Sequence, residues 1–291
     1  MAVIEARGLR KAFGRNLALD GIDLHVPEGR VVGLIGPNGA GKTTALSALL
    51  GLTPYEGDLR VLGRDPWRAR HRLMQDVAFI ADVAVLPRWI RVAQLLAYVA
   101  GVHPRFDRSR AESLLEVTGI RSHQRVRELS RGMVTQLHLA VVMAIDARLL
   151  VLDEPTLGLD LVFRKQFYDR LLEDYYDRSR TIVVATHQVE EIEHVLTDVV
   201  VLDRGRVVLA ASTEALEARY RQVSVRPEQL AAARALQPIH ERQALGRPLL
   251  LFDGGDPARL ASLGEVRAPT LAELYVAVIG GQARPAEGAP R

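Results

Sequence analysis

A glycine-rich stretch at residues 36–44 constrains this chain more than any other feature. It fits the pattern G-x-x-x-x-G-K-[ST] and consists of Gly36, Pro37, Asn38, Gly39, Ala40, Gly41, Lys42, Thr43 and Thr44. An apolar run precedes it and a helical pattern follows it, so we expect a strand, a loop and a helix. In such a loop, backbone N–H groups surround nucleotide phosphates at the positive end of the helix. We therefore expect all nine residues to bind nucleotide, with Lys42 at the β- and γ-phosphates and Thr43 at Mg²⁺.

Composition excludes several classes of protein. The 291 residues are enough for one large domain and a small one, and the 38 basic and 35 acidic residues are scattered, which predicts no nucleic-acid surface. The chain contains no cysteine, which excludes disulfides, thiolate catalysis and cysteine-based metal sites. No signal peptide is visible, and apolar runs such as residues 95–102 fall short of the ~20 residues that span a bilayer. We expect a cytoplasmic protein.

Hydrophobic patterning along the chain predicts an α/β fold. Two antiparallel strands come first, and a largely parallel sheet follows. The strands are expected at residues 2–8, 22–26, 31–35, 57–62, 77–80, 149–152, 181–185, 199–203 and 206–210. Helices are expected at residues 66–73 and 161–177. Phe13 is expected in the loop between the first two strands, where its ring can stack on a purine; packing in the core is the alternative.

Two segments are predicted to stand apart from this sheet. Helical patterns at residues 91–118 and 130–146 indicate a lobe that covers about residues 83–146. After residue 220 the pattern changes, and residues 221–280 predict a small C-terminal α+β accessory domain. The last segment, residues 281–291, is rich in Gly, Ala, Pro and Arg and is predicted to be disordered. The main domain is accordingly expected at residues 1–220.

Polar side chains follow two of the predicted parallel strands. Asp153 and Glu154 come directly after residues 149–152, and His187 comes shortly after residues 181–185. Because the carboxyl ends of parallel strands meet at one edge, where open α/β sheets bind ligands, we expect these side chains to lie close together. Taken alone, the acidic pair is as compatible with helix capping as with catalysis. A single histidine is likewise compatible with a structural role.

The order and spacing of these motifs resemble the ATP-binding subunits of ABC transporters. The motifs are Leu129-Ser130-Arg131-Gly132-Met133, Asp153-Glu154-Pro155, Leu157-Gly158-Leu159-Asp160 and His187. The resemblance covers about residues 1–220 and implies a P-loop NTPase core of the ABC ATPase type. It also implies that Asp153 assists Mg²⁺, that Glu154 polarises the attacking water and that His187 contacts the γ-phosphate of ATP.

The resemblance further implies a head-to-tail homodimer with two ATP molecules at its interface. Residues 129–133 resemble the family signature LSGGQ, keep Ser130 and Gly132, and depart from it at Arg131 and Met133. In the family, this signature faces the phosphate loop of a second subunit, and the loop that contains Asp160 communicates across the interface.

Two other positions depart from the family pattern. Asp82 stands where the family usually has a glutamine that touches Mg²⁺ and senses the membrane partner. Since a carboxylate can also bind Mg²⁺, we expect Asp82 to couple metal occupancy to the helical lobe; a solvated loop residue is the alternative. Leu157 stands where serine is common, and nothing in the sequence explains this change.

The resemblance implies an ATPase subunit that powers export through a separate membrane permease. Residues 103–107 and 270–275 resemble exporter-type ATPases whose permeases are separate chains. The permease is expected to dock on the lobe around residues 82–107, near Trp89, Arg91 and Tyr98; packing of these side chains in the core of the lobe is the alternative. Docking there places the chain on the inner face of the cell membrane. The cargo cannot be read from the sequence.

Two competing functions follow from the same motifs. A soluble ABC-type ATPase that acts on ribosomes or nucleic acid generally has two nucleotide domains or a long coiled-coil arm, and this chain has neither. A regulatory module with negligible turnover is disfavoured by the intact Lys42, Asp153, Glu154 and His187.

Overall fold

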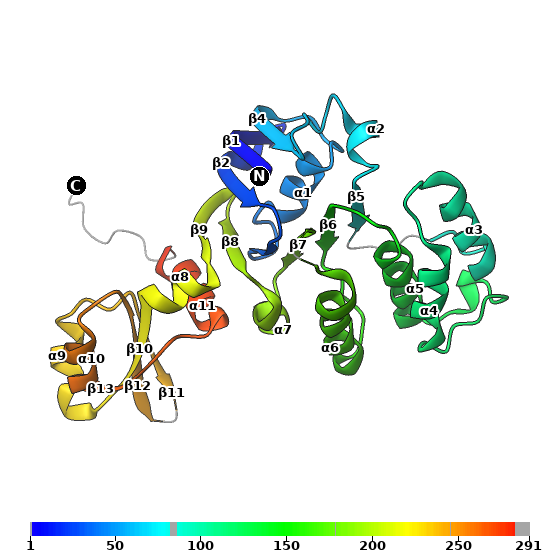
Figure 1. Ribbon diagram of the computed structural model, residues 1–291. Helices are drawn as coiled ribbons and strands as arrows, with labels where there is room; N and C mark the ends of the chain where they lie inside the picture. Colours follow the sequence, from blue (N-terminus) through cyan, green and yellow to red (C-terminus); the bar gives the residue numbers. More distant parts are fainter. Residues whose placement is uncertain (1, 82–85, 178, 245, 283–291) are drawn as a thin grey trace. The chain divides into compact units, whose positions relative to one another are not determined.

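The computed structural model describes residues 2–81, 86–177, 179–244 and 246–282 of the chain. They form two compact units. The first comprises Met1–Leu196 with Leu202–Val207, and the second Thr197–Val201 with Val208–Arg291. Figure 1 shows the ribbon with its helices and strands labelled.

A six-stranded sheet carries the phosphate loop. Its strand order is β5 (Val77–Ile80), β6 (Leu149–Asp153), β7 (Thr181–Thr186), β3 (Val31–Ile35), β8 (Asp198–Asp203) and β9 (Arg206–Ser212). The first four strands pair in parallel, and every residue of β3, β6 and β7 is buried. Parallel strands covered on both faces require such continuous apolar runs. Their register sets Ile35 beside Thr186 and Asp153 beside Ala185, so the three strands end at one edge.

A three-stranded antiparallel sheet precedes the parallel one in the chain. Its order is β2 (Asn16–Pro27), β1 (Ala2–Phe13) and β4 (Glu56–Val61). The first two strands are much longer than predicted, because Gly14, with a φ of 60°, allows a two-residue turn that lets pairing continue to its tip. The prediction that Phe13 lies in a loop is wrong: it is the last residue of β1, paired with Asn16.

The helices of the first unit fall into two groups. Within the described residues, α1 (Lys42–Leu49), α6 (Leu161–Arg170) and α7 (Val189–Ile192) belong to the segments that alternate with the parallel strands. The helix predicted at residues 66–73 is only the short α2 (Arg70–Leu73), and α6 passes into a π-helical turn at Leu171–Tyr175. The second group forms a lobe with a hydrophobic core of its own and consists of α3 (Val92–Val102), α4 (Arg108–Glu116) and α5 (Arg131–Met143).

The turn between α3 and α4 fastens this lobe to the parallel sheet. Asp107 caps α4 by accepting a hydrogen bond from the N–H of Arg110. Its own N–H donates to the carbonyl of Ala144 at 2.8 Å. Arg105 pairs with the carboxylate of Asp76, immediately before β5, at 2.9 Å. The turn is therefore held to the end of α5 by a backbone hydrogen bond and to the start of β5 by an ion pair.

The second unit contains a four-stranded antiparallel sheet. Its order is β11 (His240–Ala244), β12 (Arg247–Asp253), β10 (Tyr220–Val225) and β13 (Gly264–Arg267). The apolar face of this sheet shares one hydrophobic cluster with α9 (Leu230–Arg234) and α10 (Pro257–Leu263). The unit also holds α8 (Thr213–Arg219) and α11 (Leu271–Gln282). The prediction that disorder begins at residue 281 is wrong, because α11 extends to Gln282; residues 283–291 lie outside the described residues.

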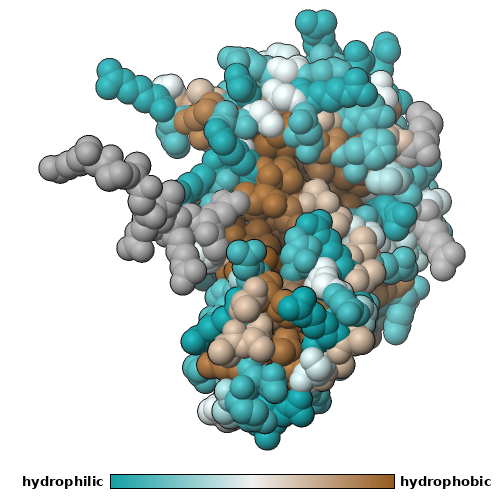
Figure 2. Space-filling view, turned by 90° about the vertical axis from the view of Figure 1, so that its left-hand side faces the viewer, coloured by the Kyte–Doolittle hydropathy of each residue, from teal (hydrophilic) through white to brown (hydrophobic). Residues whose placement is uncertain are grey.

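On the face shown in Figure 2, hydrophilic side chains form most of the margin and hydrophobic ones gather toward the centre. Two aromatic side chains of the helical lobe are prominent on the surface: Trp89 is 70% and Tyr98 64% exposed. Among the helices in the described part of the chain, none has the length and apolar character needed to cross a bilayer.

Candidate nucleotide site

The loop after β3 has the backbone geometry of a phosphate cradle. Gly39 and Gly41 have φ angles of 81° and 106°, which side chains of L-residues rarely adopt. A Cβ atom at Gly41 would lie 2.6 Å from the carbonyl oxygen of Ala18, and one at Gly36 would lie 2.4 Å from that of Leu202. Glycine is therefore required sterically at these positions. Gly41 is also the N-cap of α1 and provides no side-chain cap, which suits an anion at this helix end.

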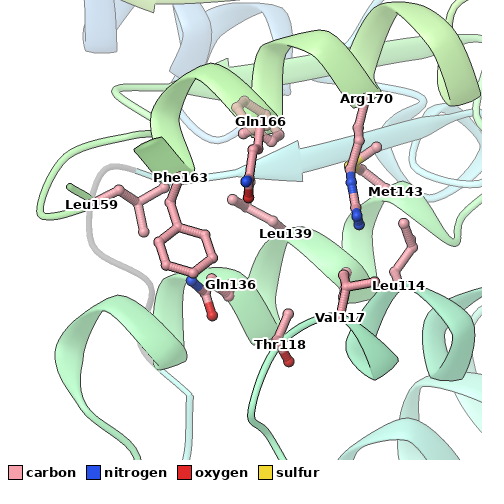
Figure 3. A pocket seen from close by; sticks show the side chains of 12 residues that line it. Leu114, Val117, Thr118, Gln136, Leu139, Met143, Leu159, Phe163, Gln166 and Arg170 are labelled. Carbon is pink, nitrogen blue, oxygen red and sulfur yellow. The ribbon is translucent and has the colours of Figure 1, made fainter. Parts of the chain in front are cut away.

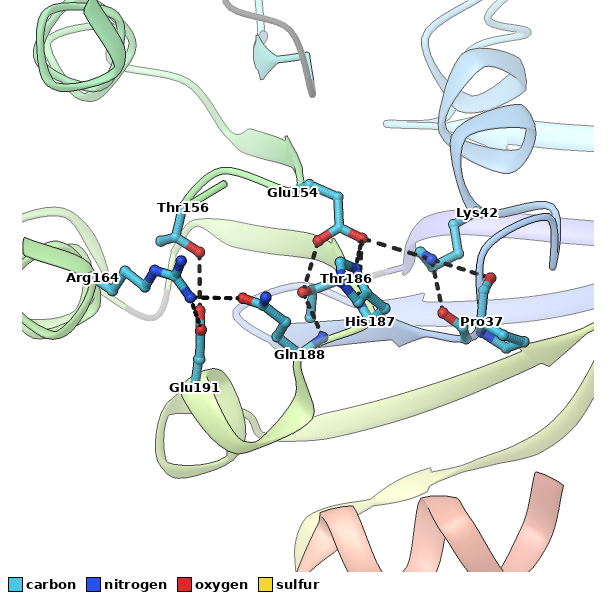
Figure 4. A network of polar contacts seen from close by, with 10 residues as sticks. Pro37, Lys42, Glu154, Thr156, Arg164, Thr186, His187, Gln188 and Glu191 are labelled. Carbon is cyan, nitrogen blue, oxygen red and sulfur yellow. Dashed lines mark hydrogen bonds and ion pairs between the residues drawn. The ribbon is translucent and has the colours of Figure 1, made fainter. Parts of the chain in front are cut away.

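Lys42 is turned back onto its own loop. Its side chain is only 7% exposed, and its Nζ donates to the carbonyl oxygens of Gly36 at 2.8 Å and Pro37 at 3.4 Å. The same Nζ lies 3.7 Å from Oε1 of Glu154 (Figure 4). The ammonium group is thus buried among oxygen atoms beside the cradle, where phosphate oxygens can compete for it.

Glu154 joins the ends of β6 and β7. Its Oε2 accepts a hydrogen bond from Oγ1 of Thr186 at 3.0 Å. Its Oε1 accepts one from the backbone N–H of His187 at 3.1 Å and lies 2.8 Å from the Nδ1 of that ring. Glu154 has a φ of 46°, so its backbone is in the left-handed region. Asp153, which precedes it, is buried at the end of β6. The predicted strand-end residues therefore meet at one edge of the sheet, beside Lys42.

A cavity of about 460 Å³ opens over the loop and these side chains. Its described lining consists of Phe13, Asn16, Leu17, Ala18, residues 37–44, Glu154 and Arg204. Cavities of roughly 300–1,000 Å³ hold small ligands and cofactors. Phe13 is 54% exposed at the cavity, although it belongs to a strand, and the Nζ of Lys11 lies 4.9 Å from its ring centroid. The cavity thus combines an aromatic ring, a phosphate cradle and two cationic side chains.

Arg204 lines the cavity and was not predicted from the sequence. Arg204 has a φ of 46° at the tip of the β8–β9 hairpin. The next residue, Gly205, donates its N–H to the carbonyl of Ala40 at 2.9 Å and accepts from the N–H of Asp20 at 2.8 Å. The hairpin tip is therefore fastened to both the phosphate loop and β2. No signal in the sequence links these distant segments.

The signature-like segment and Asp160 lie at helix starts. Ser130 caps α5 by accepting from the N–H of Met133 at 3.2 Å, and Asp160 caps α6 by accepting from Phe163 at 3.0 Å. Arg131 is exposed, and a Cβ atom at Gly132 would meet only the carbonyl oxygen of Gly158, at 4.0 Å. Residues 130–133 are absent from the described lining of the nucleotide cavity. Asp82 lies outside the described residues.

The described side chains do not form a complete metal site by themselves. In these ranges there is no group of three or more His, Asp or Glu that could hold a metal ion. Thr43, at the start of α1, and Asp153, at the end of β6, offer oxygen ligands. Such ligands suit Mg²⁺, an ion that normally takes its remaining ligands from phosphates and water.

A second cavity, of about 70 Å³, lies between α4, α5 and α6 (Figure 3). Its lining includes Leu114, Val117, Leu139, Met143 and Phe163. It is mostly apolar and borders no phosphate-binding loop, so it is not the nucleotide site.

The fold and the site together define a P-loop nucleotide-binding protein. Comparison with known families places residues 19–157 in the family described as "ABC transporter". The Nod factor export ATP-binding protein I of Cupriavidus metallidurans is 33% identical over 276 residues, which cover 89% of this chain and 88% of the relative. The daunorubicin resistance ATP-binding protein DrrA3 of Streptomyces coeruleorubidus is 31% identical over 98% of both chains. The chain belongs to the ABC transporter family, as an ATP-binding subunit.

Solved structures support the fold. An ATP-binding subunit of an ABC transporter matches with a TM-score of 0.67, covering 74% of this chain and 92% of that one at 23% identity. The cbiO1 protein of Clostridium perfringens matches with a TM-score of 0.63 at 24% identity, covering 75% of this chain and 91% of that one. The predicted family, the ABC-type P-loop fold and the ATPase class are therefore confirmed.

Proposed function

We propose that this chain hydrolyses ATP to power export through a separate membrane permease. The proposal that the chain hydrolyses ATP rests on one observation: Lys42, Glu154 and His187 lie in contact with one another beside the glycine-rich phosphate loop, through the carboxylate of Glu154. The export part is supported by relatives that match nearly the whole chain and are named for export or drug resistance. The names of these relatives do not favour the alternative, an ATPase that acts on ribosomes or nucleic acid.

The proposed roles follow from the chemistry of phosphoryl transfer, in which positioning and charge neutralisation do most of the work. Lys42 and the amides of residues 36–44 bind the phosphates, and Phe13 stacks on the base. Thr43 and Asp153 hold Mg²⁺, with Asp82 as a further ligand; when bound, the ion neutralises phosphate charge. Glu154 orients and activates the attacking water, and His187 contacts the γ-phosphate.

In the proposed resting arrangement, Glu154 is already oriented before ATP enters. The Thr186 hydroxyl and the His187 amide each donate to a different oxygen of its carboxylate. A phosphate group in the cradle draws Lys42 away from the loop carbonyls and weakens its attraction to Glu154. The carboxylate is then free to accept a proton from water.

We also propose the head-to-tail homodimer, with one ATP at each composite site. The described lining of the cavity has no contribution from residues 130–133, so Ser130, Arg131, Gly132 and Met133 are available to meet the nucleotide of a second copy. Asp160 then lies in the loop between the two sites. Residues 1–220 form the ATP-binding domain, with the helical lobe at about 83–146, and residues 221–280 form the accessory domain.

The permease is proposed to dock on the helical lobe. Trp89 and Tyr98 expose most of their aromatic surface, and Arg91 is exposed at the start of α3. Exposed aromatic side chains with a neighbouring arginine are common at the centres of protein interfaces. Through this contact the chain is held peripherally at the inner face of the membrane.

The test is purification of the tagged Glu154→Gln chain from its native cells in mild detergent with ATP and Mg²⁺. We expect a polytopic membrane protein to accompany it. A double variant, Trp89→Ala with Tyr98→Ala, is expected to lose that partner while still binding ATP. Recovery of ribosomal material or of a homodimer alone from solubilised membranes would contradict the transport proposal and leave the ATPase chemistry standing.

A further inference from the structure

Arg164, in the first turn of α6, joins two loops of the site without lying in the nucleotide cavity. Its Nε donates to the carbonyl oxygen of Leu159 at 2.8 Å. Its Nη1 donates to Oε1 of Gln188 at 3.0 Å and also pairs with the carboxylate of Glu191 (Figure 4). Leu159 lies between Glu154 and α6, whereas the other two partners follow β7. One guanidinium group therefore fastens the loop after β6 to the loop after β7.

The contacts continue from Arg164 along two routes, one to the carboxylate of Glu154 and one to the chain just after Glu154. On one route, the N–H of Gln188 donates to Oγ1 of Thr186 at 3.0 Å, and that hydroxyl donates to Glu154 at 3.0 Å. On the other, Oε2 of Glu191 accepts a hydrogen bond from Oγ1 of Thr156 at 3.1 Å, two residues after Glu154. Both threonines are buried, so each link is made in a protected environment.

Arginine is the residue type that this junction needs. Its planar guanidinium presents five N–H donors in a fixed fork, so it can serve a carbonyl, an amide and a carboxylate at once. A lysine would retain the attraction to Glu191 through a single ammonium group on a flexible stem. It could not hold the carbonyl of Leu159 and the amide of Gln188 in the same fixed geometry.

We propose that Arg164 is a positioning residue for hydrolysis. It fixes the loop at residues 155–160 against the segment at residues 186–191, which runs from the end of β7 into α7, and so sets how Glu154 and His187 face the γ-phosphate. The inference rests on the proposed ATPase function. Because Arg164 is not among the described residues that line the cavity, its loss lowers turnover and leaves ATP binding by the phosphate loop intact.

The experiment compares Arg164→Ala, Arg164→Lys and the control Lys165→Ala in the full chain. Lys165 is the next residue of α6, is exposed and carries the same charge. We measure kcat and KM for Mg²⁺–ATP, the affinity for a fluorescent ATP analogue, and Tm. Arg164→Ala is expected to lower kcat by roughly 10- to 100-fold, because it misplaces the catalytic groups. Its KM for Mg²⁺–ATP and its affinity for the analogue should stay within about twofold of the wild-type values. Arg164→Lys should be intermediate, and Lys165→Ala should match the wild type.

Two results overturn the inference: a kcat of Arg164→Ala within about twofold of wild type, or equal losses in kcat and nucleotide affinity. Should Arg164→Ala not fold, Gln188→Ala removes one contact of the junction and must lower kcat in the same selective way. A wild-type chain without Mg²⁺-dependent turnover would contradict the proposed function itself. Normal wild-type turnover with fully active Arg164 variants would contradict only the role of Arg164.

Discussion

Glu154 is the residue of the site that contacts both the end of β7 and the lysine of the phosphate loop. Its carboxylate touches Thr186 and His187 and lies 3.7 Å from the Lys42 ammonium. Glu154→Gln preserves the size of the side chain and removes its ability to accept a proton. We expect phosphate release to fall by roughly two orders of magnitude or more, which is the contribution of a positioned general base. ATP binding, measured by equilibrium titration, should persist.

The matched control for this variant is Glu190→Gln on α7, an exposed glutamate in the same region of the chain. It should hydrolyse ATP at the wild-type rate. If Glu154→Gln also retained turnover, Glu154 would have to be removed from the role of base, and the Lys42–Glu154 contact would be left with an electrostatic role only.

Among the residues of the site, those that belong to a local motif could be predicted from the sequence. Residues whose place depends on contacts between distant segments of the chain could not. Lys42, Glu154 and His187 were predicted because a glycine pattern or a strand end marks each of them. Arg204 and Arg164 carry no such mark. Arg204 reaches the cavity because Gly205 is bonded to Ala40, and such long-range pairings cannot be read from spacing.

At the scale of elements, the start of α11 shows how a short motif fastens a helix to a sheet. Glu273 accepts a hydrogen bond from the N–H of Thr270 at 2.9 Å, and its own N–H donates to the hydroxyl of that threonine at 3.2 Å. This reciprocal pair is a capping box. The carboxylate also accepts from Arg267 of β13, at 2.5 Å, and pairs with Arg242 of β11. The helix is therefore tied to both edge strands of the C-terminal sheet.

These contacts predict a pH dependence. Burial alone raises the pKa of Glu273, but the bonds from Arg267, Thr270 and Arg242 lower it from 4.5 to about 2. A depressed pKa contributes stability that is fully present above pH ~4.5 and is lost as the pH falls toward 2. Glu273→Gln should lower the Tm of the full chain at pH 7, and the difference from wild type should shrink between pH 4.5 and 2. A constant difference across that range would contradict the anchor; Glu265→Gln, on β13, is the control.

Element prediction succeeded where apolar runs were long and failed where they were short. Buried parallel strands such as β6 and β7 were predicted within a residue or two, because a strand covered on both faces must be continuously apolar. The edge strand β11 reads His-Glu-Arg-Gln-Ala and is mostly exposed, so it has no apolar pattern to detect. It exists because β12 offers a pairing edge, which is a property of the folded sheet.

At the scale of the whole molecule, the decisive question is whether two chains complete each ATP site. Gly132 allows a direct test, because a Cβ atom there would meet only the carbonyl oxygen of Gly158, at 4.0 Å. Gly132→Asp should therefore fold normally; an acidic residue in the first helical turn even favours the helix, by about 0.3–1 kcal/mol. In a head-to-tail dimer, however, the new carboxylate would face the γ-phosphate of the partner's nucleotide and repel it.

We expect Glu154→Gln to double its mass in light scattering when ATP is added, and the Glu154→Gln/Gly132→Asp chain to remain monomeric with an unchanged Tm. Gly119→Asp in the same background is the control, since Gly119 also has open space around it but lies in the turn after α4. This control should still dimerise. A dimer that survives Gly132→Asp would show that residues 130–133 do not face the nucleotide, because like charges so close to a phosphate are strongly repelled. The signature segment would then keep only its role at the start of α5, and each ATP would have to be hydrolysed within a single chain.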